Sequence, residues 1–129
     1  MSNYLIDTWA WIEYLKGSPA GEIAAAIIQD ENNDCYTSSV CIAEISSKYL
    51  RENLDPLVAE NAINNLTKVI DVDAAIAASA GKVHADLRKK ISNLGLTDAI
   101  IIATAKKFGL KIVTGDKHFK EISNAVLIG

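Results

Sequence analysis

Four carboxylates stand beside the predicted strands in positions that suit a shared metal ion. Asp7 ends the first strand-like run, and Asp116 comes two residues after the fourth. Asp98 starts the helical segment that leads into the fourth run, and Glu44 lies about one turn into the helix after the second. Carboxylates held close together repel one another unless a cation is present, and Mg²⁺ or Mn²⁺ takes oxygen ligands while keeping waters for chemistry. Such a site can activate a water for attack on a phosphodiester.

The elements that must position these carboxylates alternate between strand and helix along the whole chain. Short apolar runs at residues 4–6, 35–37, 69–70, 111–114 and 125–128 predict five strands, the last at an edge. This alternation indicates an α/β fold with a parallel sheet and helices on both faces. The loops after parallel strands gather at one rim of the sheet, where ligands bind. We therefore expect all four carboxylates at that rim.

Helix signals fill the segments between the strands. Helices are predicted at residues 8–16, 19 to about 29, 40 to about 51, from 56, 73 to about 90, and 99–108. Gly17 and Gly109 are placed to end two of them, and the Asp55-Pro56 pair is a helix start. Asp73 is expected to cap its helix and to have a structural role only.

Each carboxylate also has an ordinary structural explanation. Asp7, Asp98 and Asp116 stand at or near helix starts, where aspartate caps free N–H groups. Glu44 is four residues before Lys48, the spacing of an exposed ion pair on a helix. Only their convergence on one rim favours a metal site over these roles. No histidine or cysteine is expected to join the group and make it a zinc site.

Composition limits the class of protein. The 129 residues, half of them apolar, are expected to form one domain, residues 1–129. No apolar run approaches the about 20 residues that span a bilayer, and the first residues lack the basic start of a secretion signal, so we expect a soluble, cytoplasmic protein. Cys35 and Cys41 match no metal or redox pattern and are expected to be free thiols, partly buried.

The net charge of −3 conceals an asymmetry between the halves of the chain. Residues 1–65 carry three basic and ten acidic residues, a net charge of −7, whereas residues 66–129 carry ten basic and six acidic residues, a net charge of +4. Such a distribution can create a basic face for a polyanion on an acidic protein.

The carboxylates stand in four motifs whose order covers nearly the whole chain: YLIDT at 4–8, SSVCIAEI at 38–45, LTDAIIIATA at 96–105 and IVTGDKHF at 112–119. In these motifs the chain resembles the PIN-domain nucleases, and specifically the small VapC-type ribonuclease toxins of type II toxin–antitoxin systems. The resemblance implies a three-layer α/β/α sandwich with strand order 3-2-1-4-5. It also implies a homodimeric, Mg²⁺- or Mn²⁺-dependent endoribonuclease that acts on RNA and is inhibited by a small DNA-binding antitoxin.

The resemblance assigns roles by motif position. Asp7, Glu44, Asp98 and Asp116 correspond to the family's acidic quartet, with Asp7 and Asp98 as the most direct metal ligands. Thr114 corresponds to a hydroxyl position that orients a ligand or a water.

Two alternatives remain open from the sequence. One is a housekeeping PIN-domain nuclease for RNA processing that has no antitoxin, and another is a non-catalytic PIN module that binds RNA or protein. A phosphoryl-transfer enzyme with Asp7 as nucleophile is disfavoured, because a phosphatase of that kind needs a second aspartate where Trp9 stands.

Residues that flank the motifs have two interpretations each. Lys117 and His118 suit either an RNA phosphate or a solvated helix start. His84 precedes three basic residues and suits a solvated helix end more than an RNA contact. Trp9 and Trp11 cannot share a helix face, so one is expected in the core and the other at a protein interface or stacked on a base.

Gly115 separates the fourth strand from Asp116. It is expected to be the bend by which the chain leaves the strand.

Overall fold

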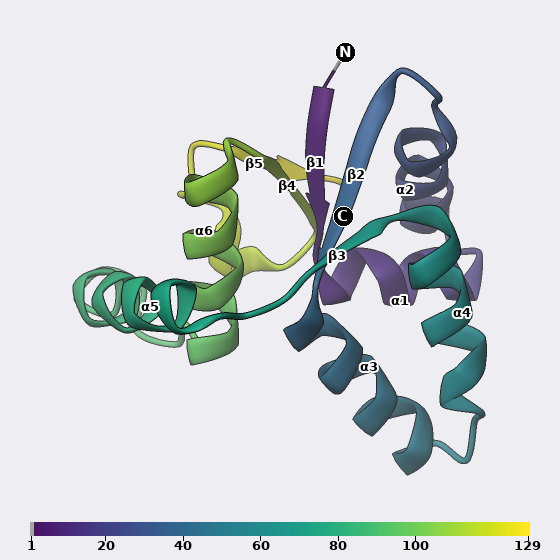
Figure 1. Cartoon of the computed structure of the whole chain (residues 1–129), viewed down its shortest axis with the longest axis horizontal. Helices are drawn as coiled ribbons and strands as arrows, with labels where there is room; N and C mark the ends of the chain where they lie inside the picture. The colour runs from purple at the N-terminus through teal and green to yellow at the C-terminus, as the bar shows by residue number, and fades with distance from the viewer. Residues whose placement is uncertain (1) are drawn as a thin grey trace.

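Five parallel strands form one sheet in the order β3-β2-β1-β4-β5 in the computed structural model, which describes residues 2–129 (Figure 1). The strands are β1 (Ser2–Ile6), β2 (Asn33–Ser38), β3 (Lys68–Ile70), β4 (Lys111–Thr114) and β5 (Ala125–Leu127). All four pairings are parallel, and β1 lies between β2 and β4. The expected strand order is confirmed, and with it the adjacency of the first and fourth strands.

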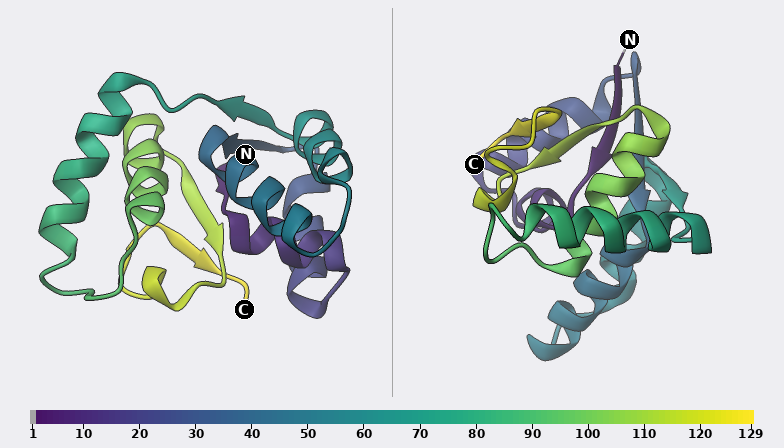
Figure 2. Two further views of the ribbon diagram at one scale, coloured as in Figure 1. Left: turned by 90° about the horizontal axis from the view of Figure 1, so that it is seen from below. Right: turned by 90° about the vertical axis from the view of Figure 1, so that its left-hand side faces the viewer.

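Helices cover both faces of the sheet, which gives the expected three layers (Figure 2). They are α1 (Thr8–Lys16), α2 (Pro19–Gln29), α3 (Ser39–Arg51), α4 (Pro56–Leu66), α5 (Ala74–Leu87), α6 (Leu96–Phe108) and the 3₁₀ helix η1 (Lys117–Phe119). Figure 2 shows α5 and α6 together on one side and α1 to α4 on the other.

The alternation of side chains along β1 and β4 divides the core between these two sides. Ile6 and Val113 pack in the cluster that includes Trp11 of α1 and Ala24 of α2. Their neighbours Leu5 and Ile112 pack in the cluster that includes Ile101 of α6. Successive strand residues point to opposite faces, so each strand is fixed by both layers and its carboxyl end has a defined position.

Side-chain caps and left-handed glycines set the helix ends. Asp55 accepts a hydrogen bond from the Leu57 N–H, and Asp73 accepts one from Ile76, as expected of N-caps. Gly17 and Gly109 have φ of 69° and 65° and end α1 and α6, as predicted.

Two helix boundaries next to the rim differ from expectation. The helix α5 ends at Leu87 rather than near residue 90, because the N–H groups of Lys90 and Ile91 both turn back to the Leu87 carbonyl. The turn brings Leu94 into the core, where its side chain is fully buried. The helix α6 then begins at Leu96, three residues earlier than predicted.

The described residues contain no helix that is long and apolar enough to cross a membrane. Cys35 and Cys41 are both free, as predicted, but they are buried rather than partly buried.

Candidate functional site

The carboxyl ends of β1 and β4 bring the first and last carboxylates to the same rim. Ile6 is paired with Val113 in the sheet, and the Asp7 N–H donates to the Val113 carbonyl at 3.0 Å, which extends the ladder by one residue. Asp116 follows the last residue of β4 by two positions. The rim predicted from the alternation of elements is therefore where these two residues lie.

Asp7 is a buried carboxylate with both oxygens engaged. Its side chain is 5 % exposed; Oδ1 accepts from the Thr8 N–H at 2.8 Å, and Oδ2 accepts from the Thr114 hydroxyl at 2.8 Å. Burial raises the pKa of Asp7 from 3.8 to about 7; the two hydrogen bonds oppose that rise, and the charges of Asp98 and Glu44 add to it. Capping thus accounts for one oxygen of Asp7 but does not explain the burial of a charge.

Thr114 joins the two strand ends through its hydroxyl group. Oγ1 donates to Asp7 Oδ2 and accepts from the Asp116 N–H at 3.0 Å. The side chain is fully buried. The hydroxyl therefore fixes the orientation of one carboxylate and the backbone that carries another.

Asp98 and Asp116 meet at the rim together with a histidine. Asp98 Oδ2 accepts from the Gly95 N–H at 3.0 Å, which is why α6 begins at Leu96 and Asp98 occupies its third position. Asp116 Oδ1 accepts from the His118 N–H at 2.9 Å. One ligand atom from each of Asp98, Asp116 and His118 lies within 4.8 Å of the others.

His118 corrects the expectation that no histidine joins the carboxylates. Its Nδ1 is 3.4 Å from Asp98 Oδ2 and 3.2 Å from Asp116 Oδ1. Burial, followed by the charge of Asp116, raises the pKa of Asp98, whereas the Gly95 N–H and His118 lower it. The tight turn at Asp116 produces this contact, and spacing in the sequence alone does not reveal the direction of the imidazole ring.

Glu44 reaches the rim from α3 through a residue that sequence reasoning gave no role. Its Oε1 accepts from the Thr8 hydroxyl at 2.7 Å, and its charge acts on the buried Asp7. The alternative explanation of Glu44 as a surface partner of Lys48 is wrong, because Lys48 instead contacts Glu52 at 2.7 Å. The signal that could have indicated Thr8 is its position directly after Asp7, at a helix start.

The Trp9 ring packs beside the site, and its position explains why residue 115 is a glycine. A Cβ atom added to Gly115 would come within 2.3 Å of the Trp9 ring, and one added to Gly129 would come within 2.5 Å. Gly115 has no positive φ, unlike Gly17 and Gly109, so the expected bend is not its reason. The indole ring lies against the backbone at this point, and only glycine leaves room for it.

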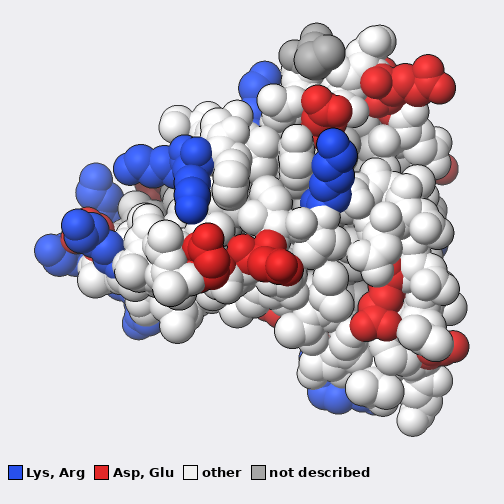
Figure 3. Space-filling view, viewed as in Figure 1, with Lys and Arg blue, Asp and Glu red and all other residues white. Residues whose placement is uncertain are grey.

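The remaining flanking residues are placed as follows. Trp11 is the core tryptophan, fully buried and donating from Nε1 to the Thr37 hydroxyl at 3.0 Å. His84 is not a solvated helix end, because its Nε2 lies 3.1 Å from the Leu94 carbonyl. On the face shown in Figure 3, Lys and Arg residues gather over α5 and α6, while most acidic residues lie elsewhere.

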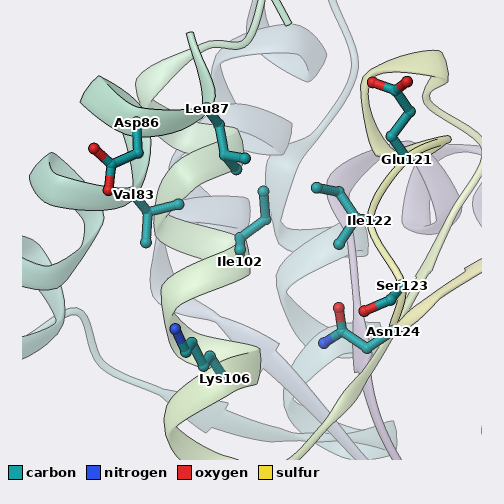
Figure 4. Close-up of a pocket in the computed structure, with 9 residues that line it drawn as sticks. All are labelled: Val83, Asp86, Leu87, Ile102, Lys106, Glu121, Ile122, Ser123 and Asn124. Carbon is teal, nitrogen blue, oxygen red and sulfur yellow. The ribbon is translucent and has the colours of Figure 1, made fainter. Parts of the chain in front are cut away.

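A separate pocket of about 510 Å³ lies between α5, α6 and the segment before β5 (Figure 4). Val83, Leu87, Ile102 and Ile122 point toward one another inside it. None of the four carboxylates lines this pocket, so it is distinct from the cluster of Asp98, Asp116 and His118.

Comparisons with known proteins identify the family and the fold. Residues 4–125 match the PIN domain. Ribonuclease VapC2 of Haemophilus influenzae is 31 % identical over 128 residues, covering 95 % of this chain and 93 % of that protein. Ribonuclease VapC11 of Mycobacterium tuberculosis is 32 % identical over 125 residues, with 92 % and 90 % covered. Among solved structures, DNA-bound VapBC from Salmonella typhimurium matches with a TM-score of 0.77 at 22 % identity, covering 100 % of both chains.

Proposed function

The chain belongs to the PIN domain family, and on this premise we propose that it is an Mg²⁺- or Mn²⁺-dependent endoribonuclease, the toxin of a toxin–antitoxin pair. The observation that carries the proposal is the convergence of Asp98, Asp116 and His118 within 4.8 Å at the rim. Next to them, Asp7 is buried with its pKa raised to about 7. The two relatives of the chain named above are ribonucleases. This similarity gives the phosphodiester bond of RNA as the proposed substrate class.

The residues present fit a divalent cation. Their carboxylate oxygens are the donors that Mg²⁺ and Mn²⁺ favour, and the buried Nδ1 of His118 has no hydrogen-bond partner among the described residues. Asp7, Asp98 and Asp116 would hold the ion, and Glu44 would bind it through a water or position the attacking water. When bound, the ion supplies Lewis-acid activation of that water and of the phosphodiester.

The chain's own residues prepare the site for this chemistry. Thr114 keeps Asp7 oriented and favours its ionised form, because the hydroxyl donates to Oδ2. Thr8 holds Glu44 at 2.7 Å, so the carboxylate is positioned before substrate arrives. Attack by the water forms a new P–O bond and breaks the bond to the 3′ oxygen, which takes up a proton. The products are a 5′-phosphate and a 3′-hydroxyl.

The proposal includes the partners that such a toxin needs. A cognate small DNA-binding antitoxin would inhibit the chain, and residues 1–129 would act as a single PIN domain in a cytoplasmic homodimer. The similarity to the DNA-bound VapBC structure supports the antitoxin, because VapBC proteins are a family of toxin–antitoxin systems.

The test combines RNA cleavage with growth. Asp7→Asn keeps the capping oxygen but removes the charge, so cleavage should be lost while the fold persists. Asp73→Asn is the matched control, because Asp73 caps α5 and its carboxylate lies 3.8 Å from Lys107 near the end of α6. Cleavage that survives Asp7→Asn or excess chelator would contradict the proposal. Growth arrest that is relieved by an antitoxin encoded by the neighbouring gene would distinguish a toxin from a housekeeping nuclease. Metal binding without RNA cleavage would indicate a non-catalytic binding module.

A further inference from the structure

His118 directs a ring nitrogen at the two partly buried carboxylates of the cluster, those of Asp98 and Asp116. The residue stands in the middle of η1, and its own N–H donates to Asp116 Oδ1, which turns the side chain back over the rim. The imidazole is about one-third exposed, at 34 %, but its Nδ1 atom is buried. Nδ1 lies 3.2 Å from Asp116 Oδ1 and 3.4 Å from Asp98 Oδ2.

Hydrogen bonding within the chain does not account for this arrangement. Nδ1 is near enough to both oxygens, yet no hydrogen bond of acceptable alignment joins it to either of them in the described residues. A protonated imidazole would form an ion pair with both carboxylates, whereas a neutral imidazole with its proton on Nε2 would point a lone pair at two anionic oxygens, which is unfavourable without a cation between them. A metal ion takes the place of the ring proton, because the nitrogen lone pair and the carboxylates then bind the same charge.

We propose that His118 Nδ1 is a direct ligand of the metal ion held by Asp98 and Asp116. The resulting nitrogen and oxygen donor set favours Mn²⁺, or another first-row transition ion, over Mg²⁺. Imidazole suits transition-metal ions, whereas Mg²⁺ prefers oxygen donors and keeps its waters. This inference rests on the proposed metal dependence and deepens it by naming the ion class that the site selects.

The chain offers an unusually clean spectroscopic test, since it contains two histidines, His84 and His118. Purified protein is titrated with Mn²⁺, and binding is followed by the loss of the free-ion electron paramagnetic resonance signal. Echo modulation from ¹⁴N then reports whether an imidazole nitrogen coordinates the bound Mn²⁺. We expect ¹⁴N modulation in the unchanged chain, and a changed pattern after labelling with ¹⁵N-histidine, which needs no substitution.

Two substitutions assign the nitrogen. His118→Gln should abolish the modulation and weaken Mn²⁺ binding about tenfold or more, while Mg²⁺ binding should change less than about threefold, because Mg²⁺ makes little use of nitrogen donors. His84→Gln is the matched control and should leave both properties unchanged, because His84 stands on α5 and its Nε2 contacts the Leu94 carbonyl rather than a carboxylate. Circular dichroism confirms that each variant is folded.

The outcomes separate this inference from the proposed function. Mn²⁺ that binds without ¹⁴N modulation, or modulation that persists in His118→Gln, would overturn the role of His118 and leave a metal-dependent nuclease in place. A chain that binds neither Mn²⁺ nor Mg²⁺ would overturn both.

Discussion

The Thr114 hydroxyl donates to Asp7 Oδ2 at 2.8 Å, joining residues that are 107 positions apart in the sequence. The bond crosses from β4 to β1 at the rim and lies in a fully buried position. Because it counters part of the burial that raises the pKa of Asp7, it keeps a larger fraction of that carboxylate ionised near neutral pH. Thr114 is thus a positioning residue that acts through Asp7.

Thr114→Val tests this positioning role. Valine keeps the shape but removes the hydrogen bond, so the pKa of Asp7 should rise further. Losing a hydrogen bond to a charged group corresponds to roughly a tenfold or greater fall in kcat/KM at pH 7. The deficit should shrink at higher pH as Asp7 ionises.

Thr104→Val is the control for that substitution. Thr104 is also fully buried, but its hydroxyl donates to the Ile100 carbonyl within α6. RNA cleavage should be close to that of the unchanged chain. A Thr114→Val enzyme with full activity and an unshifted pH profile would contradict the role of Thr114.

The raised pKa of Asp7 predicts a pH dependence of stability in metal-free protein. A pKa of about 7 in the folded state, against 3.8 as the ordinary value, means that the folded state binds more protons between about pH 4 and pH 7. The free energy of unfolding should therefore fall as pH rises through this window, by at most about 4 kcal/mol. Urea denaturation at pH 5 and pH 8 with a chelator measures the change.

Asp7→Asn isolates this contribution. The variant has no group to titrate at residue 7, so it should be less dependent on pH and more stable than the unchanged chain at pH 8. Added Mn²⁺ should stabilise the unchanged chain at pH 8 more than the variant, since the ion binds the ionised carboxylate. Parallel pH profiles for the two proteins would show that Asp7 is not the buried charge responsible.

The location of the carboxylates at one rim follows from patterns of local chemistry, whereas the strand order follows from the resemblance to the PIN-domain nucleases. Capping residues, left-handed glycines and apolar runs define α1 and β4 within the chain itself. The direction of the His118 ring and the reason for Gly115 depend on contacts between distant segments, which spacing does not encode. Trp9 and Gly115 are 106 residues apart, and only the packed structure brings them together.

Gly115→Ala tests the close approach of Trp9. A Cβ atom at residue 115 would lie 2.3 Å from the indole ring, so the ring or the backbone of the rim must shift. Overpacking of this kind costs about 1–3 kcal/mol of unfolding free energy. Urea denaturation should show that loss, and cleavage should fall too, because Asp116 is the next residue.

Gly81→Ala is the matched control. Gly81 is exposed in α5 with no atom within 4 Å of an added Cβ, and alanine in a helix is more favourable than glycine by about 1 kcal/mol. This variant should be slightly stabilised. Replacing Trp9 by alanine should also reduce the cost of Gly115→Ala, and an unchanged cost in that background would rule out the indole ring as its cause.

The basic segment between α5 and α6 is expected to contact the RNA backbone. Arg88, Lys89 and Lys90 are exposed and precede Gly95, whose N–H donates to Asp98. The contact of His84 with the Leu94 carbonyl ties this segment to α5 near the rim. Reversing all three charges to glutamate should raise the KM for RNA about tenfold or more, and it should lessen the dependence of binding on salt.

A second triple substitution at Lys106, Lys107 and Lys111 changes the net charge by the same amount at a different place. These residues lie at the end of α6 and the start of β4. They are therefore at the amino ends of the strands, whereas the carboxylates are at the carboxyl ends. If position matters, RNA binding should weaken much less in this variant than in the first, while Mn²⁺ affinity stays the same in both. Equal losses would mean that the overall charge attracts RNA, and the segment 88–90 would then have no special place in the substrate path.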